Sequence, residues 1–160
     1  MQKNPLDDIV IREADLSDVS SIVNAFSDYL EEIKDNPEQE LTFSNYNVRL
    51  FRMMLIESIS NHDICPVIAL IGSKKIGFNF WIKISSFELK EEIVHALGTF
   101  ISEDYRGLGL VNILANRSFE YLKSKGVKKV YGKVFKNRTS SSKLVNSLEL
   151  ERIEILCKTL

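Results

Sequence analysis

The residues best placed to do chemistry lie in one short turn, where Arg106, Gly107 and Gly109 form an Arg-Gly-x-Gly sequence. An apolar, strand-like segment ends at Ile101 before the turn, and an amphipathic helix follows it to about Lys125. Glycines let the backbone bend sharply, which leaves several N–H groups unpaired at the start of the helix. Those donors and the positive end of the helix dipole attract phosphate oxygens. The turn therefore predicts a site for the phosphate of a small molecule.

Two other phosphate-binding motifs do not fit this turn. A Walker A loop would continue with Gly-Lys-Ser or Gly-Lys-Thr, and no such sequence follows. The dinucleotide fingerprint would place Gly or Ala three positions after Gly109, where this chain has Asn112, and it would belong to an initial βαβ unit. Neither kind of nucleotide site is expected.

The composition is that of a soluble globular protein. Of 160 residues, 44% are hydrophobic and 27% charged, which suits a single domain over residues 1–160. The net charge of −1 gives no reason to expect nucleic acid or an anionic membrane as a partner. The chain has no apolar run that could span a bilayer, no secretion segment and two isolated cysteines. We therefore expect a cytoplasmic protein without a metal site.

Apolar periodicity predicts strands and helices in continuous alternation. Strands are expected at residues 9–14, 66–71, 76–84, 92–101, 128–135 and 151–157, and helices at 16–34, 44–60, 110–125 and 139–147. Asp15 or Ser17 can cap the first helix, and residues 72–75 should join two strands as a hairpin. The segment 92–101 is apolar on both faces, so it should be central in the sheet. The order β-α-α-β-β-β-α-β-α-β predicts one α/β domain.

In this order and in its glycine turn, the chain resembles the GNAT (Gcn5-related N-acetyltransferase) superfamily. The resemblance covers nearly the whole chain, from Ile9-Val10-Ile11-Arg12 and Asp18 to the last strand. The family motif is Arg/Gln-x-x-Gly-x-Gly/Ala, and here it follows Tyr105 and extends from Arg106 to Val111. The resemblance implies a mixed central sheet whose fourth and fifth strands splay apart, with acetyl-CoA as the co-substrate.

The resemblance also implies a set of cofactor contacts. The pyrophosphate of acetyl-CoA would be held by the backbone amides of the turn, which comprises Arg106, Gly107, Leu108, Gly109, Leu110 and Val111. The pantetheine arm would contact the backbone of Phe100 and Ile101, and would approach Asn137 after the fifth strand. Lys123, Lys125, Lys128 and Lys129 could attract the 3′-phosphate of CoA, although lysines near a helix C-terminus are favourable without any ligand.

Several positions depart from the family pattern. Val111 stands where the family prefers Gly or Ala, which is acceptable if its side chain turns into the core. Leu144 and Val145 occupy the region where many members have a tyrosine that protonates the CoA thiolate, and Leu148-Glu149-Leu150 replaces Leu-Gly-Phe. Only one further strand is expected after residue 147, which would leave a sheet edge open unless a second subunit or a loop covers it. A homodimer is therefore one expectation.

Acetyl transfer to an amine needs a base for the amine and a donor for the thioester oxygen. The backbone N–H of Ile101 could be that donor. His95 and Glu92 are candidate bases on the strand 92–101, and the period of two places His95 and Thr99 on one face. Tyr131 is a candidate acid for the thiolate, whereas Tyr105 should belong to the scaffold of the turn. The competing interpretations are a core or edge role for His95, a solvated charge for Glu92 and core packing for Tyr131.

The acceptor side is predicted from charge. The acidic residues Asp28, Glu31, Glu32, Asp35, Glu38 and Glu40 could attract a cationic amine, but a solvated helix face and loop is the simpler explanation and needs no substrate. We therefore carry two hypotheses of function. The first is an acetyl-CoA-dependent N-acetyltransferase that moves an acetyl group to a small or peptidyl primary amine by direct transfer. The alternative, based on the departures above, is a catalytically degenerate GNAT-like domain that binds acyl-CoA as a sensor or binds a protein partner.

Overall fold

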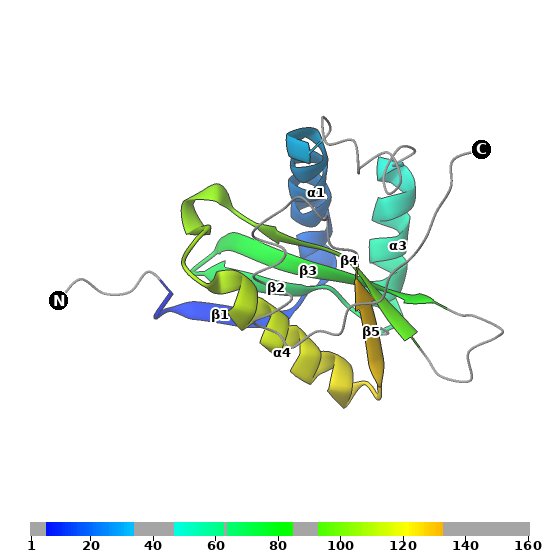
Figure 1. The fold of residues 1–160 in the computed structure, drawn as a ribbon. Helices are drawn as coiled ribbons and strands as arrows, with labels where there is room; N and C mark the ends of the chain where they lie inside the picture. The colour runs from blue at the N-terminus through cyan, green and yellow to red at the C-terminus, as the bar shows by residue number, and fades with distance from the viewer. Residues whose placement is uncertain (1–5, 34–46, 63, 85–92, 133–160) are drawn as a thin grey trace, which may run out of the picture.

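The computed structural model describes residues 6–33, 47–62, 64–84 and 93–132, which form a mixed α/β domain around one sheet (Figure 1). The strands are β1 (Ile9–Glu13), β2 (Val67–Ile71), β3 (Lys74–Ile84), β4 (Ile93–Ile101) and β5 (Lys129–Gly132). The helices are α1 (Val19–Ile33), α3 (Val48–Ser60) and α4 (Leu110–Ser124), with 3-10 turns η1 (Leu16–Asp18) and η3 (Glu103–Tyr105). The strand order is β1-β2-β3-β4-β5, antiparallel throughout except for the parallel pair β4–β5.

Helices cover both faces of the sheet. Figure 1 shows α1 and α3 on one face and α4 on the other. The alternation of β2 explains this arrangement: Ile68 and Leu70 pack with α1 and α3, whereas Val67 and Ala69 pack with α4. All four side chains are buried. Since side chains alternate along a strand, a sheet with helices on both faces needs strands that are apolar throughout, as this sequence predicts.

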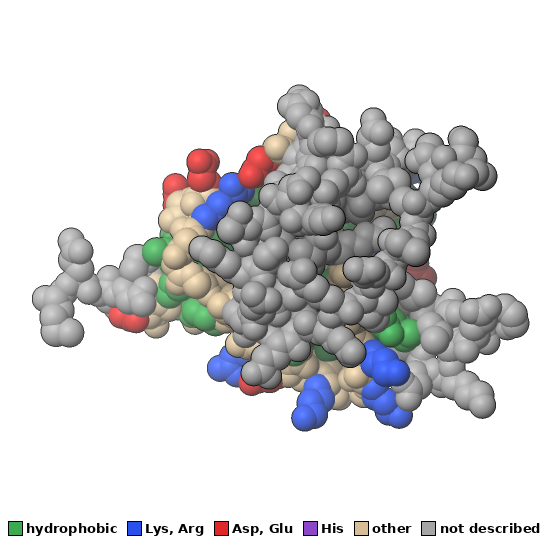
Figure 2. All heavy atoms as spheres, in the orientation of Figure 1, with side chains coloured by type: hydrophobic (Ala, Val, Ile, Leu, Met, Phe, Trp, Pro, Cys, Tyr) green, Lys and Arg blue, Asp and Glu red, His purple; other side chains and the backbone are tan. Residues whose placement is uncertain are grey.

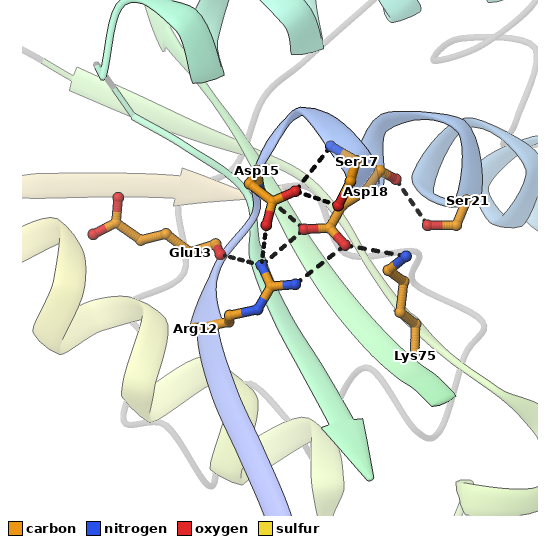
Figure 3. Close-up of polar contacts among 7 residues, drawn as sticks. All are labelled: Arg12, Glu13, Asp15, Ser17, Asp18, Ser21 and Lys75. Atoms are coloured by element: carbon orange, nitrogen blue, oxygen red, sulfur yellow. Dashed lines mark hydrogen bonds and ion pairs between the residues drawn. The ribbon is translucent and has the colours of Figure 1, made fainter. Parts of the chain in front are cut away.

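The start of α1 is fixed by an ionic cluster around the buried Asp18, which links it to β1 and β3 (Figure 3). The Asp18 carboxylate accepts two hydrogen bonds from Arg12, at 2.8 and 3.3 Å, and lies 3.1 Å from Lys75 Nζ. It also accepts from the Asp15 N–H at 2.9 Å, and Asp15 in turn caps Ser17. Burial by itself raises the pKa of Asp18, but the hydrogen bonds from Arg12, Asp15 and Lys75 outweigh it and hold the pKa below its usual range.

Most predicted elements are confirmed, with two corrections at their ends. The hairpin between β2 and β3 has the two-residue loop Gly72-Ser73 instead of four residues, because Gly72 adopts the left-handed φ of 58° that a tight loop requires. Helix α3 begins at Val48 and not near Ser44, because Asn47 is extended and its side chain caps the Leu50 N–H at 3.0 Å. The predicted helix 139–147 and strand 151–157 lie outside the described residues.

Two searches of the described residues concern membranes and metals. None of the described helices combines the length and hydropathy that crossing a membrane requires. Within the same ranges, no three His, Cys, Asp or Glu side chains gather as ligands of a metal ion would.

Candidate functional site

The glycine turn connects β4 to α4 through η3. Gly107 and Gly109 both have left-handed backbones, with φ of 79° and 81°. A Cβ built on either glycine would meet no heavy atom within 4 Å. These positions therefore need glycine for its backbone conformation and not because of crowding. Among the described residues, the space beside these two glycines is therefore open.

The N–H groups of this turn are unusually accessible. Gly109 is the N-cap of α4 and has no side chain to cap the helix. The first backbone hydrogen bond of α4 runs from Asn112 N to Gly109 O at 3.1 Å. Among the described residues, the N–H groups of residues 107–111 donate no hydrogen bond. Five unpaired donors at the positive end of a helix make an arrangement suited to phosphate oxygens.

The side chains of the turn point away from this open space or lie at its rim. Leu110 is buried, and Val111 packs against the same α4-side cluster as Leu114. Val111 therefore turns toward the core, the condition under which a β-branched residue fits this motif. Tyr105 also packs against that cluster, and Lys74 Nζ lies 5.1 Å above its ring, so its expected scaffold role agrees with its position.

Beyond Ala96, the edge of β4 that leads to the turn is open among the described residues. Ser102 N donates to Ile76 O at 2.9 Å, which identifies the hydrogen-bonded pairs of the antiparallel β3–β4 ladder. By the alternation of such a ladder, Phe100 pairs its backbone with β3, while Thr99 and Ile101 direct theirs to the opposite side. On that side the described pairing with β5 covers only Ile93 to Ala96. Of the two predicted pantetheine contacts, Ile101 therefore faces the open edge and Phe100 faces β3.

A β-bulge interrupts β4 in its middle. Phe80 pairs with Gly98 and Trp81 pairs with Ala96, so Leu97 is an extra residue in β4. Such a residue shifts the alternation of all side chains beyond it. The prediction that His95 and Thr99 share a face is therefore wrong.

The pairing partners assign the two faces. His95 pairs with Ile82, which packs on the α1–α3 side. Thr99 pairs with Asn79, whose Nδ2 donates to Ser118 of α4 at 2.9 Å on the other side. Sequence reasoning missed both the bulge and this buried anchor of α4. The only local signals were Gly98 inside a strand and a lone Asn in an apolar strand.

The candidate acid and base residues are partly brought together. His95 pairs with Tyr131 across the parallel strands β4 and β5, so both side chains lie on the α1–α3 side of the sheet. Tyr131 is 37% exposed, which contradicts the prediction of core packing. Glu92 and Asn137 lie outside the described residues. His95 and Ile101 are six residues apart, or roughly 17–20 Å along a strand, so they cannot both act directly on one reacting carbon.

The lysine cluster lies far from the turn. Lys123, Lys125, Lys128 and Lys129 are exposed at the far end of α4 and the start of β5, and Figure 2 shows basic side chains gathered along that edge. Helix α4 has 15 residues and is therefore roughly 20 Å long. That length exceeds the separation of the phosphates within one CoA molecule. The suggested contact with the 3′-phosphate does not fit this arrangement.

The acidic stretch is described only in α1. Asp28, Glu31 and Glu32 are exposed, while Asp35, Glu38 and Glu40 lie outside the described residues. Glu32 forms a two-bond ion pair with Arg106, at 3.0 and 2.8 Å. The Arg106 side chain also donates from Nε to the Ile101 carbonyl at 3.0 Å. Arg106 therefore uses its side chain within the protein.

Comparison with known proteins agrees with this geometry. The model of the acetyltransferase (GNAT) family matches residues 21–147. Among curated protein sequences, none matches this chain significantly. The fold is similar to that of a GCN5-related N-acetyltransferase from Ralstonia eutropha JMP134, with a TM-score of 0.74, 11% identity and coverage of 95% of this chain and 98% of that one.

Two further solved structures have the same fold. One is a possible acetyltransferase from Clostridium difficile 630, with a TM-score of 0.72, 13% identity and coverage of 96% of this chain and 97% of that one. The other is the aminoglycoside N-acetyltransferase AAC(6')-Iy in complex with CoA, with a TM-score of 0.69, 14% identity and coverage of 95% and 93%. At these identities the similarity establishes the fold.

Proposed function

Because the chain belongs to the acetyltransferase (GNAT) family, we propose that it moves an acetyl group from acetyl-CoA to a primary amine by direct transfer. The observation that carries the proposal is the row of five unpaired N–H groups at residues 107–111, which adjoins the open edge of β4. A pyrophosphate needs donors of this kind, and the open space beside Gly107 and Gly109 accommodates it. The structural relative AAC(6')-Iy was solved in complex with CoA.

The edge of β4 suits the pantetheine arm. Thr99 directs its N–H and C=O groups to this edge and Ile101 its N–H group, while the Ile101 carbonyl already accepts from Arg106 Nε. An extended chain with amide groups can add there as a further strand. With its two amides, the arm is about as long as four extended residues, or roughly 13 Å. Starting at Ile101, that length reaches the bulge at Leu97 and Gly98. We therefore place the reacting thioester at the bulge, and the donor for its oxygen is a backbone N–H there and not that of Ile101.

The reaction itself is simple to balance. The amine nitrogen attacks the thioester carbon, a C–N bond forms, the C–S bond breaks, and the amine loses a proton while the thiolate gains one. A fixed backbone donor stabilises the negative charge that develops on the thioester oxygen. His95 lies two residues before the bulge and accepts the amine proton, directly or through one water molecule. Its neighbour Tyr131 protonates the thiolate.

A cationic amine is the proposed acceptor. Helix α1 presents the exposed acidic residues Asp28 and Glu31 on the side of the sheet that also holds His95 and Tyr131, whereas the charge of Glu32 is paired with Arg106. An acidic wall raises the local concentration of a cationic substrate. One structural relative is an aminoglycoside acetyltransferase solved with sisomicin. Aminoglycosides and polyamines are therefore the first acceptors to test.

The position of Val111 no longer supports the alternative of a domain that binds acyl-CoA without turnover. Val111 packs toward the core and leaves the turn open. The other departures, at Leu144 and at Glu149, lie outside the described residues. This alternative is therefore one outcome of the experiment.

The experiment follows the release of free CoA thiol from acetyl-CoA in the presence of aminoglycosides, polyamines and short peptides. The proposal expects amine-dependent release that saturates with at least one cationic acceptor. Acetyl-CoA binding without release for any amine would favour the alternative. No binding would refute both the transferase and the acyl-CoA sensor, and would leave only the domain that binds a protein partner. His95→Gln should lower kcat roughly 100-fold and remove the acidic limb of the pH profile. An unchanged profile would remove His95 from the mechanism and leave the function intact.

A further inference from the structure

The Arg106 side chain joins the glycine turn to the end of β4 and to α1, which is distant in sequence. Its Nε donates to the carbonyl of Ile101 at the end of β4, at 3.0 Å. Its two terminal nitrogens donate to the two carboxylate oxygens of Glu32 in the last turn of α1, at 3.0 and 2.8 Å. The backbone of Arg106 begins the glycine turn. One side chain thus fixes the turn to β4 and to the helix on the acceptor side.

The charges of this contact are arranged favourably. The last turn of α1 contains no basic residue of its own, and it includes the acidic Glu31 and Glu32 at the negative end of the helix dipole. Arg106 brings a positive charge to this end. The two hydrogen bonds of the planar guanidinium also fix its orientation more firmly than a single contact would fix the ammonium group of a lysine. Both side chains of the pair are nearly half exposed, at 43% and 46%. We therefore expect the ion pair to affect the neighbouring turn and not the stability of the whole domain.

The turn needs such a restraint. Two of its residues, Gly107 and Gly109, have the conformational freedom of glycine, and the N–H groups of residues 107–111 have no partner among the described residues to hold them. A ligand that binds these groups must order any part of the turn that moves. We propose that Glu32 is a positioning residue for the turn: it holds Arg106, and Arg106 holds the N–H groups in the arrangement that phosphate requires. The proposal relies on the proposed function only for the identity of the ligand.

The loss of the Glu32 carboxylate should change the affinity for phosphate in opposite directions under a positioning role and under simple electrostatics. Removal of a carboxylate near an anion site should strengthen the binding of phosphate, because a negative charge disappears and Arg106 becomes available. The positioning role predicts the opposite, because the turn loses its restraint. Asp104 offers a matched control, since it forms an exposed ion pair with Lys74 at 3.1 Å, two residues before Arg106, without connecting to α1.

The first measurement is the Kd of CoA for the wild-type chain, Glu32→Gln and Asp104→Asn, by titration calorimetry at low and high salt. We expect Glu32→Gln to weaken binding about two- to fivefold at low salt, with a smaller difference at high salt, as for an exposed ion pair. Asp104→Asn should bind equally well or more tightly. Equal or tighter binding by Glu32→Gln would overturn the proposal.

The second measurement needs no ligand. Backbone 15N relaxation should show lower order parameters at Gly107 and Gly109 in Glu32→Gln, with unchanged values in Asp104→Asn. Unchanged values in Glu32→Gln would also overturn the proposal. If the wild-type chain bound no CoA, the proposed function would fall, whereas the relaxation data would still decide whether Glu32 positions the turn.

Discussion

A negative charge placed at the start of α4 should abolish CoA binding without unfolding the protein. Gly109→Asp introduces a carboxylate at the N-cap, beside the unpaired N–H groups of the turn. The control is Gly126→Asp at the other end of the same helix, where φ is 82° against 81° at Gly109 and a Cβ also meets nothing within 4 Å. Both changes put the same side chain into a left-handed backbone, which costs roughly 1–2 kcal/mol. Only the change at Gly109 affects the proposed phosphate site.

The magnitude follows from the charge. A carboxylate roughly 5 Å from a phosphate charge is repelled by about 3 kcal/mol at an effective dielectric of about 20. That energy corresponds to a loss of affinity of more than about 100-fold. The new carboxylate also accepts hydrogen bonds from the same N–H groups, so it competes with the phosphate. The loss should therefore reach at least this size.

The assay is the shift of Tm on addition of CoA. At a concentration of about 100 Kd, the ligand stabilises the folded state by about 2.7 kcal/mol, or roughly 5–10 °C for a chain of this size. After a 100-fold loss of affinity, about 0.4 kcal/mol remains, or roughly 1 °C. Gly126→Asp should keep the full shift. A full shift in Gly109→Asp would exclude the turn as the phosphate site, and a lost shift in both variants would point to general damage of α4.

Three further predictions concern the scaffold. Asp18→Asn removes the buried charge of the ionic cluster around Asp18 and should lower the free energy of unfolding by about 2–3 kcal/mol near neutral pH. The pKa of Asp18 is lowered in the folded state. In urea unfolding, the difference in stability between variant and wild type should therefore shrink as the pH falls through that pKa. Gly77→Ala would place a Cβ 2.9 Å from the Phe100 carbonyl oxygen, and we expect a fall in Tm equivalent to about 1–3 kcal/mol. Tyr121→Phe removes the hydroxyl that accepts from the Cys65 N–H at 2.9 Å, which should cost about 1–3 kcal/mol by calorimetry; an unchanged Tm would contradict either prediction.

The glycine turn was predictable because its requirements are local. A left-handed backbone at Gly107 and Gly109 follows from the two residues themselves, and the open start of α4 follows from the lack of a capping side chain at Gly109. The contacts of Arg106 were not predictable. Its partner Glu32 is 74 positions away in sequence, and only the packing of α1 against the sheet brings the two together.

The ends of helices and strands depend on single residues, and the periodicity of apolar residues does not reveal their effect. Apolar spacing continues back to Tyr46, which favoured a helix from about Ser44, yet the amide of Asn47 caps the N–H of Leu50 and starts α3 at Val48. The same applies to the loop after β2. Its short form depends on the positive φ of Gly72, which allows the following lysines to pair with β2.

The position of His95 shows the limit of assigning side chains to sheet faces from the period of two. The side-chain alternation of a strand can be counted only between bulges, and a bulge is fixed by pairing with the neighbouring strand, which a single segment of sequence does not contain. Leu97 adds one residue to β4 opposite Phe80, so Thr99 moves to the α4 side and His95 remains on the other. The residue that does share the face of His95 is Tyr131, brought there by the parallel register of β5. A search for the acid and base of this protein should therefore follow neighbouring strands on the α1–α3 side, and not positions along β4 alone.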